Sequence, residues 1–147
     1  MKPITFYLIL LFPILIFTSM TAQELSTYKW KNRVLIITSN TMANQQFQDQ
    51  MAELQKSTKD LQERKLVVYA VTRDSYALRL SKNDTIIKLN NSKFYKEMHT
   101  EDTAFEVILI GLDGGEKLRQ TKVLETDKLF AIIDGMPMRR SEIIKNN

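Results

Sequence analysis

The side chains that could carry out chemistry in this chain are few, and the most reactive type is missing. Its 147 residues include no cysteine, so it can form no disulfide, no thiolate nucleophile and no lipid-modified N-terminal cysteine. The hydroxyls of Ser39 and Thr41 follow a short apolar run, but a hydroxyl nucleophile needs a base within hydrogen-bonding reach. The only histidine, His99, lies far away in sequence. Ser39, Asn40 and Thr41 are therefore expected to be turn and cap residues at a strand exit.

Metal and phosphate chemistry find little support in the sequence. His99 cannot build a transition-metal site by itself, because the chain has no second histidine and no cysteine. Asp113 has only Glu116 nearby, whereas a hard cation requires several oxygen ligands. The Asp-Gly-Gly segment at 113–115 lacks the length and the lysine of a phosphate-binding loop. We expect no metal and no cofactor, and we expect His99 to be exposed to solvent.

A strand–helix–strand unit must position these residues. Residues 34–37 form a short β-branched run, which is typical of a strand buried on both faces. Residues 66–71 have the same character. Between them, residues 44–64 carry Phe47, Met51, Leu54, Thr58 and Leu61 at spacings of three and four, which predicts one amphipathic helix. The short joints indicate that the two strands lie parallel in one sheet.

An antiparallel hairpin is predicted further along the chain. Residues 105–110 and 116–119 are strand-like and flank an Asp-Gly pair at 113–114, which tolerates the positive φ angles of a tight turn. The segment before them is harder to interpret. We expect Ser92 to cap a short helix, and we expect a short strand around residues 86–87.

The C-terminal part predicts a final helix that begins at residues 126–127. Gly135 and Pro137 should end it, since glycine is the usual left-handed stop and proline cannot sit inside a helix. Residues 138–144 are expected to add a further turn or two. Near the other end, Trp30 and Tyr28 are interpreted as an aromatic lid, partly buried over the edge of the core.

The first 22 residues have the pattern of a signal peptide. Lys2 precedes an almost unbroken apolar run at 4–17, and cleavage after Ala22 is expected. The alternative is an uncleaved anchor, although the run is shorter than the roughly 20 residues that span a bilayer. Residues 23–147 suit a single domain. Lys2 is one of 21 basic residues, so 20 remain against 17 acidic ones, and this scattered charge of about +3 gives nucleic acid little support as a partner.

Four strings of sequence carry a family resemblance. They are RVLIITS at 33–39, ERKLVVYAV at 63–71, VILIGLDGGEKLR at 107–119 and LFAIIDGMPMRRSEI at 129–143. The chain resembles an uncharacterised thioredoxin-like, peroxiredoxin-related family of small bacterial secreted proteins, with related domains in vertebrate equarin and in sushi-repeat extracellular matrix proteins. The resemblance implies an α/β thioredoxin-like fold: a mixed central sheet with a parallel βαβ unit, an antiparallel hairpin and a C-terminal helix.

The resemblance also locates the chemistry that is missing. Thioredoxins and peroxiredoxins carry their reactive cysteine just after the first core strand, a position that resembles 39–44 here. Their cis-proline precedes the hairpin, where this chain has Thr-Ala-Phe at 103–105. Arg119 resembles the arginine of peroxiredoxin sites, which implies an anion or ligand pocket of Ser39, Asn40, Thr41 and Arg119. Alternatively, Arg119 pairs with Asp113, Glu116 or Asp134.

Three functions follow as hypotheses. The first is an exported, non-catalytic binding or scaffold module with an extracellular or periplasmic protein as partner, secreted or periplasmic and not a lipoprotein. The second is a peroxiredoxin-related enzyme with a non-thiol activity. The third is association with an extracellular matrix or surface. After cleavage of the leader we expect no stable membrane insertion.

Overall fold

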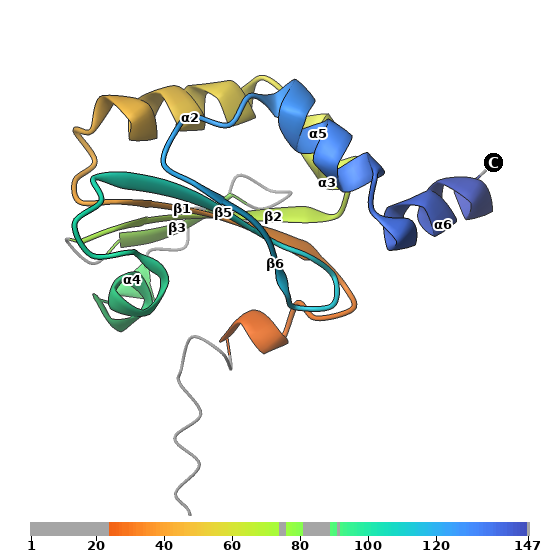
Figure 1. The fold of residues 1–147 in the computed structure, drawn as a ribbon, viewed down its shortest axis with the longest axis horizontal. Coiled ribbons are helices and arrows are strands. Elements are labelled where there is room, and N and C mark those ends of the chain that lie inside the picture. Colours follow the sequence, from red (N-terminus) through yellow and green to blue (C-terminus); the bar gives the residue numbers. More distant parts are fainter. Residues whose placement is uncertain (1–23, 74–75, 81–88, 91, 147) are drawn as a thin grey trace, which may run out of the picture.

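A six-stranded mixed sheet forms the centre of the molecule (Figure 1). The computed structural model describes residues 24–73, 76–80, 89–90 and 92–146. The predicted leader and the strand expected around residues 86–87 lie outside them. The sheet order is β4-β3-β2-β1-β5-β6. The strands are β1 (Arg33–Ser39), β2 (Leu66–Thr72), β3 (Tyr76–Leu80), β4 (Leu89–Asn90), β5 (Phe105–Ile110) and β6 (Glu116–Gln120).

The register confirms the predicted thioredoxin-like α/β architecture. Strands β1 and β2 run parallel, with Leu35 opposite Val68. Strand β5 is antiparallel to β1 and places Glu106 opposite Thr38, and β6 is antiparallel to β5. Strands β3 and β4 extend the other edge of the sheet and were not predicted.

Both faces of the central strands are buried, because helices cover the sheet on both sides (Figure 1). Since successive side chains of a strand point to opposite faces, β1 contributes side chains to two hydrophobic cores, one on each face of the sheet. Leu35 and Ile37 pack on the side covered by α2 (Gln45–Gln55), α3 (Thr58–Glu63) and α5 (Thr126–Asp134). Val34 and Ile36 pack on the side of α4 (Ser92–Met98), together with Leu25 and Tyr28 of the N-terminal turn.

The single helix predicted over 44–64 is two helices. Helix α2 ends at Gln55, where the N–H groups of Lys56 and Ser57 bond to carbonyls three residues back instead of four. This tightened turn changes the helical phase, so Leu61 is buried in α3 while Thr58, expected on the same apolar face, is exposed.

The stop at Gly135 is confirmed, but its expected left-handed conformation is wrong. Gly135 has φ −72°, and its N–H still bonds to the Ala131 carbonyl. The break arises at Pro137, which opens α6 (Pro137–Asn146) at the first helical position, where its missing N–H costs nothing. This last helix is longer than the turn or two expected. Among the described residues, no helix has the length and apolarity needed to cross a membrane.

The hairpin between β5 and β6 turns where the Asp-Gly pair predicts. Gly114 has φ +79°, a left-handed conformation that glycine adopts without strain. The Asp113 carboxylate accepts a hydrogen bond from the Gly115 N–H at 3.1 Å and pairs with the Lys117 ammonium at 2.7 Å. Hydrogen bonds with Lys117 and Gly115 hold the pKa of Asp113 below its usual value.

Candidate functional site

The loop after β1, where related folds carry a cysteine, is closed by its own hydrogen bonds. The Ser39 hydroxyl donates to the carbonyls of Thr41 and Ala104 at 2.9 and 3.1 Å. The Asn44 side chain accepts from the Phe47 N–H at 3.1 Å and so caps α2. Ser39 and Thr41 therefore make turn hydrogen bonds, as expected, but the N-cap of α2 is Asn44 and not one of residues 39–41.

Arg119, the fourth residue of the predicted pocket, lies on the other face of the sheet. It is paired in register with Ile108, which packs on the α4 side, whereas Ser39 continues the alternate row of Leu35 and Ile37. The structure therefore brings Ser39, Asn40 and Thr41 together but separates them from Arg119. A shared anion pocket of these four residues stays a prediction.

Carboxylates surround the Arg119 guanidinium. It contacts Glu116 at 2.9 Å and the buried Glu106 at 3.4 Å, and it donates to the Met98 carbonyl at 3.1 Å. The hydrogen bond with Glu116 is the main factor that raises the pKa of Arg119. Glu116 was one of the three predicted partners, and Arg119 thereby ties β6 to the end of α4.

The expectation that His99 is exposed is wrong, because its side chain is only 4% exposed. Its Nδ1 lies 2.7 Å from the Thr38 hydroxyl, and its Nε2 lies 2.9 Å from the Thr103 carbonyl. A carbonyl only accepts, so Nε2 carries the proton and Nδ1 accepts from Thr38 in the neutral ring. Glu106 lies 3.7 Å from Nδ1, and Tyr95 stacks on the ring at 4.5 Å.

This hydroxyl–imidazole pair has the geometry of a nucleophile beside its base, but both side chains are buried. Thr38 is completely buried on the α4 face of β1. Sequence reasoning missed the pair because it weighed Ser39 and Thr41, which neighbour Thr38 in the chain, and took His99 as remote. The pair joins the end of α4 to β1.

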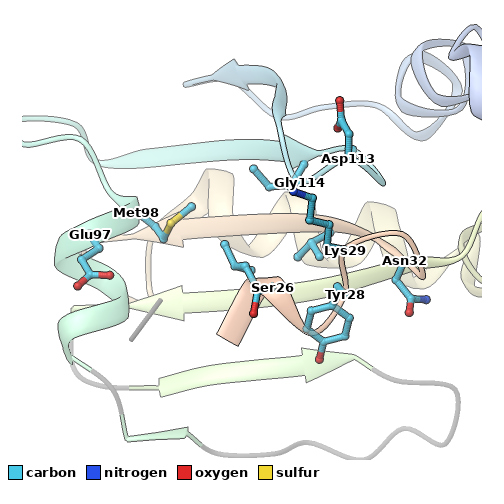
Figure 2. A pocket seen from close by; sticks show the side chains of 12 residues that line it. Ser26, Tyr28, Lys29, Asn32, Glu97, Met98, Asp113 and Gly114 are labelled. Carbon is cyan, nitrogen blue, oxygen red and sulfur yellow. The ribbon is translucent and has the colours of Figure 1, made fainter. Parts of the chain in front are cut away.

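A groove of roughly 660 Å³ opens on the same face of the sheet (Figure 2). It lies between the N-terminal turn, the end of α4 and the β5–β6 loop. The residues that line it are Leu25, Ser26, Tyr28, Lys29, Asn32, Val34, Glu97, Met98, Ile110, Gly111, Asp113 and Gly114. None belongs to the pocket that the sequence predicted.

The groove combines an apolar floor with a polar rim. Val34 and Ile110 of the sheet form part of the floor, and Met98 points into the space from α4 (Figure 2). Lys29 and Glu97 supply opposite charges from the two sides. An amphipathic ligand, with an apolar body and polar or charged ends, fits this lining.

The expectation that Trp30 forms a partly buried lid over the core is wrong. Trp30 is 61% exposed, and its backbone has φ 65°. Tyr28 does pack against the core, and its hydroxyl lies 2.9 Å from that of Tyr69. The turn that carries both residues separates them, with Tyr28 directed inward and Trp30 outward.

Neither signature of dithiol chemistry is present. The chain has no cysteine, and the part of the chain that the structure describes contains no cis peptide bond. The described residues also gather no group of three or more potential metal ligands.

Taken together, the sheet order and the helices on both faces define a thioredoxin-like fold. The chain is similar in structure to the reduced 2-Cys peroxiredoxin of Plasmodium vivax, with a TM-score of 0.52 and 16% identity over 80% of this chain and 83% of that one. It belongs to the family described as a domain of unknown function, DUF4174, which it matches over residues 24–142. No curated protein matches its sequence.

Proposed function

We propose that this chain is an exported, non-catalytic binding module that holds an amphipathic ligand or a short segment of a protein partner in the α4-side groove. The groove, with its apolar floor and charged rim, is the observation that carries the proposal. It is large enough for a small ligand, since such sites typically measure about 300–1,000 Å³.

The chemistry of the chain favours binding over turnover. The thiol position of the related fold holds a hydroxyl that donates to two backbone carbonyls, and the one hydroxyl beside an imidazole is buried. Export rests on the leader predicted at 1–22, and location in the periplasm or outside the cell belongs to the same proposal. Kinship with the domains of equarin and the sushi-repeat proteins is also part of this proposal.

A fluorescent amphipathic probe tests the groove. Anilinonaphthalene sulfonate has an apolar ring system and an anionic end that suits Lys29, and we expect it to bind the folded chain. Met98→Glu should weaken that binding about tenfold, because it places a charge on the apolar floor and removes apolar contact area. Met42→Glu is the matched control, because Met42 is 46% exposed and lies outside the groove. Equal effects of the two substitutions would contradict the proposed site.

The second candidate, a peroxiredoxin-related enzyme with non-thiol activity, has one supporting observation. The Thr38 hydroxyl lies 2.7 Å from the His99 ring, which is shorter than the 3.2 Å contact of the Thr103 hydroxyl with the same ring. Burial of both side chains argues against it. A turnover measured with peroxide separates the two candidates.

A further inference from the structure

The turn at residues 29–31 presents an indole between two lysines. Trp30 is 61% exposed, and its neighbours Lys29 and Lys31 are exposed as well. We call these three residues the basic tip. Packing does not account for the tryptophan, because Tyr28 and Leu25 of the same segment make the contacts with the core.

The backbone holds the indole outward in a conformation that is unfavourable for a large side chain. At φ 65° Trp30 lies in the left-handed region, which bulky residues rarely adopt. The backbone N–H of Trp30 donates to the Leu112 carbonyl at 2.7 Å, so the β5–β6 loop fixes this conformation. Strain of this kind concentrates at functional positions.

The charge of the basic tip is not neutralised within the described part of the chain. Neither Lys29 nor Lys31 has an ion pair with any residue that the structure describes. The nearby Asp113 is already paired with Lys117 at 2.7 Å. The Lys29 ammonium lies 5.6 Å from the centre of the Trp30 ring, so cation and indole share one small surface.

We propose that the basic tip binds an anionic lipid surface. The indole is suited to the headgroup layer, where its ring is amphipathic and its N–H finds acceptors. The two lysines would meet lipid phosphates, and each adds to the attraction. Three consecutive residues that are all exposed on one turn suit a flat charged surface. Lys29 also lines the groove, but the proposal does not depend on the groove being a binding site, because Trp30 and Lys31 lie outside its lining.

Tryptophan fluorescence tests the inference directly, because Trp30 is the only tryptophan of the chain. Vesicles of phosphatidylglycerol and phosphatidylcholine should shift its emission to shorter wavelength, and vesicles of phosphatidylcholine alone should not. Added salt should reverse the shift, since the attraction is between exposed charges. No shift with anionic vesicles would overturn the proposal.

Matched double variants separate the basic tip from general charge. Lys29→Gln/Lys31→Gln keeps the indole reporter and should weaken vesicle binding about 30-fold. Lys59→Gln/Lys128→Gln removes the same charge from α3 and α5 on the opposite face, and it should change binding less than twofold. All variants are prepared from the full sequence by one route, so residues 1–22 contribute equally. Equal losses of vesicle binding in the two double variants would overturn the proposal. Binding of the original chain to soluble dextran sulfate as strong as its binding to anionic vesicles would also overturn a specific lipid contact.

Discussion

At the scale of single residues, His99 shows how a polar side chain can be buried at little cost. Both ring nitrogens have a partner, Thr38 on one side and Thr103 on the other. The adjacent Glu106 accepts from the Thr100 N–H at 2.7 Å and contacts Arg119. Buried polar groups are tolerated when they are satisfied in this way.

Replacing His99→Ala should therefore destabilise the chain clearly. The change leaves the Thr38 hydroxyl without its partner and opens a cavity beside Tyr95, which together should lower the free energy of unfolding by about 2–3 kcal/mol. Urea unfolding measures the loss. Lys96→Ala, an exposed position of the same helix, is the control. If both substitutions have the same small effect, the network does not anchor α4.

Asp134 predicts a dependence of stability on pH. Burial acts to raise the pKa of Asp134, but hydrogen bonds from Arg64 and Arg139 outweigh it and hold the pKa below its usual value. A carboxylate whose pKa is lower in the folded state stabilises the fold above its unfolded pKa, about 3.9. That contribution disappears as the pH falls through the folded pKa. Asp134→Asn should flatten the fall in the urea midpoint between about pH 5 and pH 2. If Asp134→Asn leaves the dependence of the urea midpoint on pH unchanged, Asp134 is not a significant source of that dependence.

Among the elements, α6 is fastened to the sheet by charge. The Arg33 side chain is completely buried, and its partners are the Arg64 carbonyl at 2.9 Å and the Glu142 carboxylate at 3.2 Å. Glu142 also contacts Lys65 at 3.4 Å and Arg139 at 3.6 Å. One carboxylate on α6 therefore compensates three cations.

Glu142→Ala should weaken the attachment of α6 to β1. It leaves the buried Arg33 without its carboxylate and should cost about 3 kcal/mol of unfolding free energy. The double variant Arg33→Met/Glu142→Ala should recover part of that loss, because it removes the uncompensated charge. Lys145→Ala, exposed on the same helix, is the reference. A double variant less stable than Glu142→Ala would contradict the account.

The β5–β6 turn allows a test at adjacent glycines. Gly114→Ala forces a side chain into φ +79° and should cost about 1 kcal/mol. Gly115→Ala meets only ordinary contacts, the nearest at 3.5 Å, and should stay within about 0.5 kcal/mol of the original chain. Thermal unfolding compares the two. The reverse order of stability would show that the turn conformation differs from the one described.

The elements differ in how far the sequence predicts them. The apolar runs that form β1, β2 and β5 are buried on both faces, and such strands can be predicted from the sequence without knowledge of their neighbours. Strand β3 was missed although Tyr76, Leu78 and Leu80 alternate with Ala77 and Arg79, because the segment stands between polar residues. The groove could not be predicted from the sequence, since its lining comes from three segments that only tertiary packing brings together.

At the scale of the whole molecule, the sheet and its two helical layers form a thioredoxin-like fold, and the chain contains no cysteine. Strands β1 and β2 are buried along their whole length, and this burial stabilises the fold without a disulfide. The loop after β1 keeps its shape through Ser39 and Asn44. The two surfaces for which we propose a function are the groove and the basic tip.

The measurement that tests this account most directly is consumption of hydrogen peroxide by the purified chain in the presence of dithiothreitol. We predict a rate equal to that of the heat-denatured chain, because no thiol is present and the Thr38–His99 pair is inaccessible. A catalytic rate that scales with the concentration of folded chain and disappears in His99→Ala would contradict the claim that this molecule binds and does not turn over.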